Sequence, residues 1–358
     1  MSTFRIKIAG GGIAGLASAL AVANAGGQAV VFERAQKFEA LGAGLQIGPN
    51  AARALQYLGA WEEVEPLTVA PPAILMRDGE TGKLLKRLPL GEEFRARYGM
   101  PYRTAYRADL LHGLLRTVRA RPNIEIVMGV ETTSLDHDGF DGLLAADGVW
   151  SKLRGQLFPN AQAIKPRDVF FRSLIPMPNV SGAIDFECVN LWLFPGGHVV
   201  HYPVGNPARL NLVAITTGDA PSSFYAKAHQ SLRDVLALAP TPTSWPSAYM
   251  TGLNTWNQGN ISLIGDAAHA TLPYLAQGAA MALEDAAVLQ NLLSEAENFS
   301  KACEDFSVER IARTNKLHAR SIRQGQIYHM KSVGRQMRNI ALQAAPKALI
   351  LGRLGWVY

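Results

Sequence analysis

The hydrophobic positions at the start of the chain fall into short apolar runs separated by longer stretches of small residues, a pattern typical of alternating strands and helices. Residues 6–9 predict a strand, residues 13–25 predict a helix rich in alanine and glycine, and residues 29–32 predict a second strand that ends at Glu33. The alternation returns later, with helices predicted over 49–58 and 108–119 and strands over 124–128, 143–146 and 261–264. This pattern predicts an α/β fold with a parallel sheet.

Two other stretches are mostly β in pattern. Residues 72–105 contain strand-like runs at 73–76 and 83–88 that are separated by turn signals. Residues 167–250 contain runs at 189–194, 198–204 and 210–216 that are spaced like neighbouring strands of one sheet. The last stretch, 301–358, predicts helices, and amphipathic terminal helices more often pack on their own domain than on lipid or a partner chain.

A glycine-rich turn precedes the first predicted helix. The sequence Gly10-Gly11-Gly12-Ile13-Ala14-Gly15 is G-x-G-x-x-G in its required context of strand, turn and helix. Gly10 allows the tight turn, Gly12 lets the backbone approach a pyrophosphate, and Gly15 lets the helix pack on the sheet. Glu33 ends the next strand, where a carboxylate can hold ribose hydroxyls. The segment therefore predicts a Rossmann-like, dinucleotide-binding lobe.

A second strand–acid–helix segment lies near residues 261–295. An apolar strand delivers Asp266 to its carboxyl end, and an alanine-rich helix begins just after Pro273. The acid can accept hydrogen bonds from sugar-like hydroxyls, and the free N–H groups that open the helix can face a phosphate or an electron-rich ring. Many α/β proteins have one such segment, but here it accompanies the glycine-rich turn.

The composition agrees with a cytoplasmic enzyme that has a large core. The formal net charge is +6, and the lysines and arginines are dispersed, so we expect the chain to attract small acidic molecules rather than nucleic acid. Cys188 and Cys303 lie far apart without metal-ligand spacing, so neither a disulfide framework nor a metal site is predicted. The run at 8–32 has too little apolar area for a signal peptide or a membrane span.

In this order, the motifs resemble those of the single-component (class A) FAD-dependent aromatic hydroxylases, which have the p-hydroxybenzoate hydroxylase fold. The matching motifs are Gly10–Gly15 with Glu33, residues 147–154 (Asp-Gly-Val-Trp-Ser-Lys-Leu-Arg), and Gly265-Asp266 with its following helix. Arg107 looks like the flavin-contacting arginine that opens a helix in these enzymes. Residues 42–50, 192–203 and 272–278 are most similar to the salicylate, 3-hydroxybenzoate and 6-hydroxynicotinate hydroxylases.

The resemblance implies three parts. They are an FAD-binding domain (1–71, 106–166 and 251–300), an inserted, mostly β substrate domain (72–105 and 167–250) and a C-terminal helical segment (301–358). It also implies noncovalent FAD, transient NAD(P)H, and hydroxylation of a small phenolic acid by O2 through a flavin hydroperoxide, and it is compatible with a homodimer. The implied cofactor-binding residues are Gly10, Gly12, Ile13, Ala14, Gly15, Glu33, Arg34, Gln46, Arg107, Asp147, Asp266, Pro273, Gly278 and Ala279.

The candidate base lies on the predicted strand at 198–204. Alternation places His198, Val200 and Tyr202 on one face and Val199 and His201 on the other. From the spacing alone, a surface histidine beside an ordinary sheet tyrosine is the favoured interpretation. The His-x-x-x-Tyr spacing resembles the catalytic pair of the 3-hydroxybenzoate and 6-hydroxynicotinate hydroxylases, which implies that His198 is the general base and Tyr202 its phenol-binding neighbour.

Other polar residues have less specific signals. Gln277 is a third catalytic candidate, expected to hydrogen-bond a ring substituent of the substrate, and Gln46 is expected to line the same pocket. The alternative for both is an amide that supports the backbone. His269 is expected to be a structural histidine near the flavin. Glu284 and Asp285 are expected to make capping contacts or to face solvent beside basic groups.

The chain departs from the family in two places. The segment between Ile124 and Asp147 is shorter than expected, as if a strand pair were lost, which bears on the local sheet geometry. Residues 276–280 read Ala-Gln-Gly-Ala-Ala where G-Q-G-x-N is commoner. Two other functions stay open: an FAD oxidoreductase that acts on a quinone or polyketide, and a flavin-binding protein without turnover.

Overall fold

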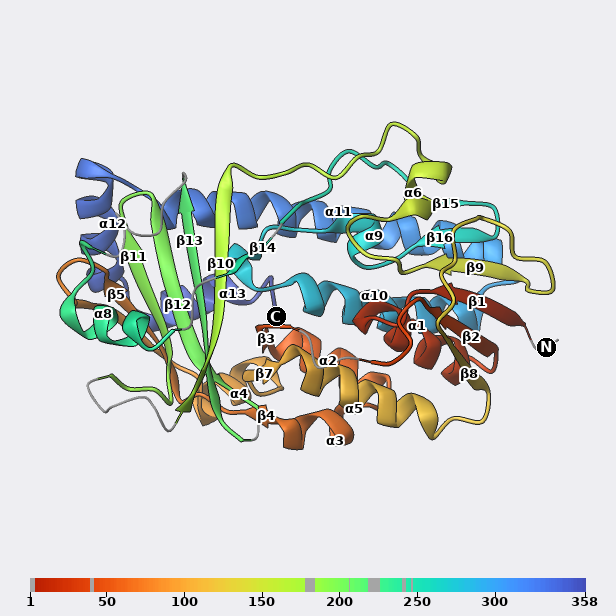
Figure 1. The fold of residues 1–358 in the computed structure, drawn as a ribbon, viewed down its shortest axis with the longest axis horizontal. Coiled ribbons are helices and arrows are strands. Elements are labelled where there is room, and N and C mark those ends of the chain that lie inside the picture. The colour runs from red at the N-terminus through yellow and green to blue at the C-terminus, as the bar shows by residue number, and fades with distance from the viewer. Residues whose placement is uncertain are drawn as a thin grey trace.

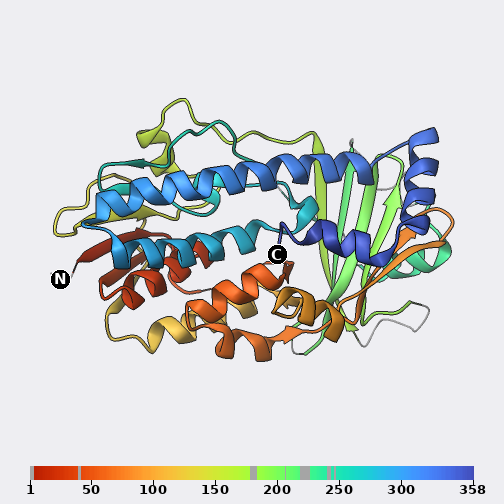
Figure 2. The same cartoon turned by 180° about the vertical axis from the view of Figure 1, so that it is seen from behind.

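The computed structural model describes residues 4–38, 42–177, 184–205, 207–217, 226–239, 243–245 and 247–358. They form an elongated molecule with a parallel sheet at one end and a mostly antiparallel sheet at the other (Figure 1). One long helix runs beside both sheets, and the C-terminus lies near the middle of the molecule (Figure 2). The predicted α/β class, with a Rossmann-like lobe, a β lobe and C-terminal helices, is confirmed.

The first sheet has six strands in the order β15-β16-β9-β1-β2-β8, and all neighbours are parallel except β15 and β16. The strands are β1 (Arg5–Ala9), β2 (Gln28–Glu33), β8 (Ile124–Met128), β9 (Gly142–Ala145), β15 (Asn257–Gln258) and β16 (Ile261–Leu263). Ile6, Ile8 and Leu144 are fully buried in its core. The apolar runs of the sequence therefore form the central strands of this sheet.

Residues 129–141, which the structure describes in full, connect β8 to β9 without a strand. They pack on β1 and β2: the rings of Phe140 and Phe32 meet edge-on at 6.2 Å, and the Arg5 guanidinium lies 4.8 Å from the centre of the Phe140 ring. Lys7 Nζ donates to the carbonyl of Asp136 at 2.8 Å. The short segment is therefore a loop that covers part of the sheet through cation–π and ring contacts.

The second sheet has seven strands in the order β14-β10-β13-β12-β11-β5-β6, antiparallel except between β11 and β5. The strands are β5 (Ala73–Asp78), β6 (Leu84–Pro89), β10 (Asp168–Pro176), β11 (Val189–Phe194), β12 (Gly197–Val204), β13 (Arg209–Thr217) and β14 (Thr243–Trp245). The runs predicted over 189–194, 198–204 and 210–216 thus correspond to β11, β12 and β13.

A small third sheet lies between the two lobes. Its strands are β3 (Gly44–Ile47), β7 (Arg103–Tyr106) and β4 (Thr68–Val69), with β7 in the centre. The predicted domain boundary after residue 105 therefore passes through β7. Residues 72–105 also include the helix α4 (Glu92–Tyr98), so this insertion is less purely β than its pattern suggested.

Most helices cover the first sheet or join the lobes, whereas α8 and α12 lie against the second sheet. They are α1 (Ile13–Asn24), α2 (Pro49–Tyr57), α3 (Trp61–Val64), η1 (Glu65–Leu67), α5 (Arg107–Arg119), α6 (Lys152–Leu157), α8 (Gln230–Ala237), α9 (Asp266–His269), η3 (Pro273–Leu275), α10 (Gly278–Glu295), α11 (Phe299–Tyr328), α12 (Ser332–Ala344) and α13 (Lys347–Leu354). At 1.5 Å per residue, α11 is about 45 Å long. Among the described residues, no helix has the length and apolar content needed to cross a membrane.

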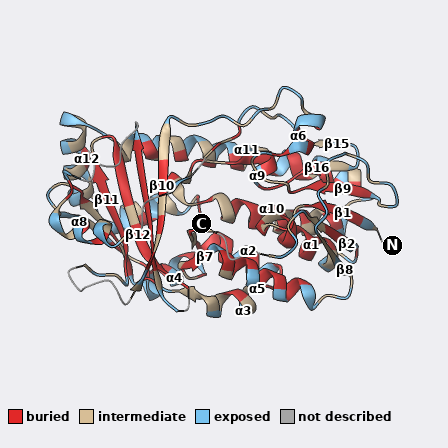
Figure 3. Ribbon diagram, viewed as in Figure 1, coloured by how far each residue is buried: buried red, intermediate tan, exposed pale blue. Residues whose placement is uncertain are grey.

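Strands β11, β12 and β13 are buried on both faces, whereas much of α12 is exposed (Figure 3). One face of these strands packs against α8 through Trp192 and Leu232, and the other faces the first lobe through Val213 and Ile215. Double burial explains why these strands are nearly continuous apolar runs.

His201 lies on the α8 side of this sheet. The indole Nε1 of Trp192 donates to His201 Nε2 at 3.0 Å. Burial, with a smaller contribution from the charge of Arg77, lowers the pKa of His201 to about 3. His201 is therefore neutral in the folded protein over the pH range in which a histidine in the unfolded chain gains a proton.

We predict that replacing His201 changes the pH dependence of stability. Below about pH 6.5 the unfolded chain binds a proton at this site and the folded protein does not, so stability falls as the pH falls toward 3. In His201→Gln, the loss of unfolding free energy between pH 7 and pH 5 should be smaller by about 2 kcal/mol, as measured by urea denaturation. The exposed His112→Gln is the control, and an unchanged loss in His201→Gln would contradict the assignment.

Candidate functional site

The sequence motifs meet at the carboxyl ends of four neighbouring strands. In the order β16-β9-β1-β2, Asp266 follows β16, Asp147 follows β9, the glycine-rich turn follows β1, and Glu33 ends β2. The turns touch one another, since a Cβ built on Gly265 would lie 2.6 Å from the Cβ of Ala14. Open α/β sheets bind ligands in the crevice outside these strand ends.

Glycine is needed at different positions of the first turn for different structural reasons. Gly10 has φ +106°, and a Cβ there would lie 2.5 Å from the carbonyl oxygen of Ala146. A Cβ on Gly15 would lie 1.8 Å from the carbonyl oxygen of Gly10, so the fold itself requires both glycines. A Cβ on Gly12 would meet nothing within 4 Å. The open side of Gly12, next to the free N–H groups that begin α1 at Ile13, is the space that a pyrophosphate needs.

Glu33 is held beside this turn. Its Oε2 accepts a hydrogen bond from the Gly11 N–H at 2.7 Å, and its Oε1 accepts from the Ala35 N–H at 2.9 Å. Arg34, the next residue, is exposed. The carboxylate therefore has a fixed position from which it can accept ribose hydroxyls.

Asp266 and Arg107 lie close enough to interact electrostatically. The Asp266 side chain is exposed to solvent, yet the surrounding protein desolvates it and raises its pKa, against the opposing charges of His269 and Arg107. A carboxyl group that is both accessible and surrounded by protein lies deep in a crevice. Arg107 is exposed at the start of α5, and its N–H donates to the carbonyl of Ala43 at 3.1 Å.

Asp147 also has capacity for a ligand. Its Oδ2 accepts from the Leu153 N–H at 3.2 Å, while its buried Oδ1 has no hydrogen-bond partner among the described residues. Buried carboxylate oxygens are normally paired, so a water or a ligand hydroxyl would complete this one. Together, the open glycine turn, Glu33, Asp266 and Asp147 fit the phosphates and hydroxyls of FAD.

Glu284 and Asp285 were expected to make capping contacts or to face solvent beside basic groups; the basic neighbours are confirmed, but exposure to solvent is wrong. Asp285 is fully buried; its carboxylate accepts from the Gly265 N–H at 3.0 Å and from Arg310 Nε at 2.7 Å, and it contacts His269. Glu284 is paired with Arg310 and Arg313. The basic partners come from α11, which packs on α10 and covers both acids. Burial alone would raise the pKa of Asp285, but the charges of His269 and Arg310 outweigh it and lower that pKa.

Gln277 lies just before α10, after a strained turn. Pro273 begins η3, and Ala276 has φ +53°, a backbone region that usually holds glycine. The buried Gln277 side chain accepts a hydrogen bond from Asn50 Nδ2 at 2.9 Å. This side-chain contact fixes the position of the Gln277 amide beside α2. Gly278, the first residue of α10, has open space where a Cβ would be, and Ala279 follows it.

The predicted register of β12 is confirmed. His198 and Tyr202 contact residues on the first-lobe side, whereas His201 contacts Trp192 on the α8 side. The alternative that His198 is a surface histidine is wrong, because only 3% of the residue is exposed. Burial, and then the proximity of His329, hold the pKa of His198 well below its usual range.

Polar groups surround Tyr202 at one end of this face. Tyr202 and Tyr102 both hydrogen-bond Gln46, so Gln46 lies beside Tyr202. Burial raises the pKa of Tyr202, and the positive charge of Arg172 on β10 opposes this shift. Arg172 is also within electrostatic range of Arg107, and its own pKa is lowered mainly by burial.

A second polar cluster surrounds His198 at the other end. His198 Nδ1 lies 2.9 Å from His329 Nε2, and His329 Nδ1 lies 3.8 Å from Asp168 Oδ2. The Tyr274 hydroxyl donates to the same Asp168 oxygen. The rings of Tyr274 and Tyr328 lie 5.8 and 5.1 Å from the His198 ring, measured between centroids.

Arg172 and His329 were not predicted from the sequence. Arg172 had a signal, because it is a lone charge in the apolar stretch 169–175. His329 had none, since it lies 131 residues from His198 in sequence and reaches it only because α11 ends beside β12.

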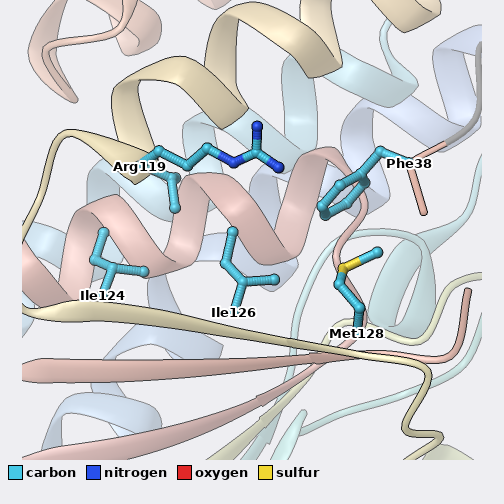
Figure 4. Close-up of a pocket in the computed structure, with 6 residues that line it drawn as sticks. Phe38, Arg119, Ile124, Ile126 and Met128 are labelled. Carbon is cyan, nitrogen blue, oxygen red and sulfur yellow. The ribbon is translucent and has the colours of Figure 1, made fainter. Parts of the chain in front are cut away.

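One depression lies away from these residues. It has a volume of about 300 Å³ and is lined by Phe38, Val118, Arg119, Ile124, Ile126 and Met128 (Figure 4). It lies between α5 and β8 on the helical side of the first sheet and is lined by none of the candidate residues.

Comparisons with known proteins agree with this geometry. A family model described as "FAD binding domain" matches residues 141–321. The chain is 31% identical over 381 aligned residues to 3-hydroxybenzoate 6-hydroxylase of Polaromonas naphthalenivorans (strain CJ2), with 99% of this chain and 95% of the relative covered. It is 30% identical to 6-hydroxynicotinate 3-monooxygenase of Bordetella bronchiseptica, with 81% of this chain and 83% of the relative covered.

A solved structure extends the match in three dimensions. The crystal structure of an HpxO variant of Klebsiella pneumoniae complexed with FAD has a TM-score of 0.87 with this chain at 20% identity. The match covers 99% of this chain and 98% of the other. At this identity the comparison shows that the two proteins share a fold.

We predict that Asp266→Ala weakens flavin retention. The substitution removes a desolvated hydrogen-bond acceptor from the crevice, and one hydrogen bond to a charged group contributes about 1.5–3 kcal/mol. The flavin-to-protein absorbance ratio of the purified variant should fall, and the equilibrium dissociation constant for FAD should rise by about 10- to 100-fold. Glu304→Ala, an exposed acid on α11, is the control. Full occupancy and unchanged affinity in Asp266→Ala would show that the carboxylate does not bind the cofactor.

Proposed function

The chain belongs to the class A FAD-dependent aromatic hydroxylases, and we propose that it uses NAD(P)H and O2 to hydroxylate a small phenolic acid of the hydroxybenzoate or hydroxynicotinate type. The observation that carries this proposal is the face of the second sheet that looks toward the crevice. There a buried, neutral imidazole, a tyrosine hydroxyl and a guanidinium share one surface. The names of the two relatives, a hydroxybenzoate and a hydroxynicotinate enzyme, support the substrate class.

His198 is the proposed base. When bound, FAD reduced by NAD(P)H supplies the activated oxygen, so the protein needs to make the ring electron-rich. Because its pKa is depressed, the His198 imidazole is neutral at physiological pH and has a nitrogen that can accept the phenol proton. Loss of that proton raises the electron density of the ring.

Tyr202 and Arg172 are proposed to bind the rest of the substrate. Tyr202 lies four positions after His198 on the strand, which is about 13 Å along the backbone. The two side chains therefore bracket a ring rather than meet at one atom. Arg172 adds a desolvated positive charge on a nearby strand, within electrostatic range of Tyr202. A half-buried guanidinium is well suited to a carboxylate, which supports an acid rather than a neutral phenol.

An apolar wall stands beside these groups. Phe170, Val213, Ile215, Leu272 and Tyr274 pack together on the same side of the sheet. Such a wall excludes water, which protects a reactive oxygen donor from wasteful breakdown and strengthens the charge interactions.

A substrate screen tests the class directly. Hydroxybenzoates and hydroxynicotinates should stimulate NAD(P)H oxidation by the purified yellow protein, and product mass should identify the ring that is hydroxylated. Stimulation by alkanes or large polycyclic compounds alone would reject the proposed substrate class. No stimulation by any aromatic acid would favour a flavin-binding protein without turnover.

We predict that His198→Ala uncouples the reaction. Loss of a general base lowers the rate by about 10² to 10⁴, while flavin binding and reduction by NAD(P)H should persist. Hydroxylated product per NAD(P)H should fall and hydrogen peroxide should rise. His201→Ala, on the opposite face, should be milder. Normal coupled turnover in His198→Ala, or a larger defect in His201→Ala, would reject the assignment.

We predict that Arg172→Met raises the KM for the acid substrate by about 10- to 100-fold, because it removes a charge-assisted hydrogen bond worth roughly 1.5–3 kcal/mol. The matching phenol without a carboxylate should lose little, and Arg172→Lys should keep part of the affinity. Steady-state kinetics on the acid and the neutral phenol separate these cases. An equal loss for both compounds would assign Arg172 a structural role.

A further inference from the structure

We propose that His329 and Asp168 form a proton relay behind His198, which carries the phenol proton away from the substrate toward the surface. This inference rests on the proposed function, since it assumes that His198 is the base. His329 acts through His198 and is a positioning and relay residue rather than a group that touches the substrate.

The contacts form a continuous line. His198 Nδ1 and His329 Nε2 are 2.9 Å apart, which is hydrogen-bond distance, and His329 Nδ1 is 3.8 Å from Asp168 Oδ2. The three residues become steadily more accessible, from 3% for His198 to side-chain exposures of 10% for His329 and 16% for Asp168. The line therefore runs from the buried face of β12 toward solvent.

The step balances as the transfer of one proton without electrons. The phenol O–H bond breaks, and an N–H bond forms at His198 Nε2. The N–H bond at His198 Nδ1 breaks, and one forms at His329 Nε2. His329 is then a cation beside the Asp168 carboxylate, and its Nδ1 proton can leave to water.

The surroundings explain why a relay is useful. A base whose pKa is held low by burial does not keep a proton for long, so the proton needs an acceptor beyond it. Burial also lowers the pKa of His329, and so do the charges of Arg338 and Lys331, whereas Asp168 raises it. Asp168 is therefore the only one of these three charges that favours a proton on His329.

The neighbouring tyrosines do not compete for the proton. The Tyr274 hydroxyl donates to Asp168, and burial raises the pKa of Tyr274. Burial raises the pKa of Tyr328 to about 12. Both phenols therefore stay protonated at physiological pH and orient the relay without joining it.

The test uses His329→Gln in the FAD-loaded protein. A glutamine carbonyl can still accept a hydrogen bond from His198 Nδ1, but it cannot take up the proton. The first readout is the apparent pKa of a bound nitro-substituted hydroxybenzoate, followed by the absorbance of its phenolate. We expect this pKa to rise by at least about one unit, a tenfold shift in the protonation equilibrium. The hydroxylation rate should fall about tenfold, with little change in KM or flavin content.

Two further variants make the result specific. Asp168→Asn keeps a hydrogen-bonding group but removes the charge, so the bound-phenol pKa should move in the same direction. Because His329 acts through His198, the double variant His198→Ala/His329→Gln should be no slower than His198→Ala. Gln326→Ala, an exposed change on the same turn of α11, is the control.

The outcomes separate this inference from the proposed function. If His198→Ala is impaired but His329→Gln and Asp168→Asn leave both the bound-phenol pKa and the rate unchanged, the relay is wrong and the base assignment stands. If His198→Ala also leaves both the bound-phenol pKa and the hydroxylation rate unchanged, the assignment of His198 as the base fails. If His329→Gln loses flavin or unfolds at a lower temperature, Asp168→Asn decides the question by the same absorbance titration.

Discussion

The buried carboxylate of Asp285 fixes the parts of the molecule on which the site depends. It accepts from the N–H of Gly265, the turn that carries Asp266, and it is paired with Arg310 of α11 and with His269. Removing one member of such a buried pair typically costs about 3–5 kcal/mol, because the remaining charge is left without a partner. One buried carboxylate therefore ties the turn of the cofactor crevice to α11.

The length of α11 passes this constraint to the other lobe. Arg310 and His329 are 19 residues apart, which is about 28 Å along a helix. At the far end, the carbonyl of His329 accepts from the N–H of Gly196, in the turn between β11 and β12. The helix that holds the nucleotide lobe together thus also sets the distance between the crevice and the strand with the candidate base, and it places a second imidazole beside it.

Local patterns made much of this fold predictable. β11, β12 and β13 are continuous apolar runs bounded by turns, and the register of β12 followed from alternation alone; the family and its cofactor followed from the ordered glycine and aspartate motifs. Partners from distant segments were not predictable. For Asp285 the sequence left capping contacts and solvent exposure both open, and its burial could not be predicted because the helix that covers it begins later in the chain. β7 looked like part of the inserted domain because its partners, β3 and β4, lie in another segment.

Oxygen labelling tests most directly whether the protein transfers one atom of O2 to a small phenolic acid, as proposed. Turnover of a stimulating hydroxybenzoate or hydroxynicotinate with NAD(P)H under ¹⁸O2 in ordinary water should give a hydroxylated product whose new oxygen carries the label. The same reaction under ordinary O2 in H2¹⁸O should give an unlabelled hydroxyl. A product whose oxygen comes from water, or NAD(P)H oxidation that yields hydrogen peroxide and no hydroxylated product, would contradict the proposed monooxygenase reaction.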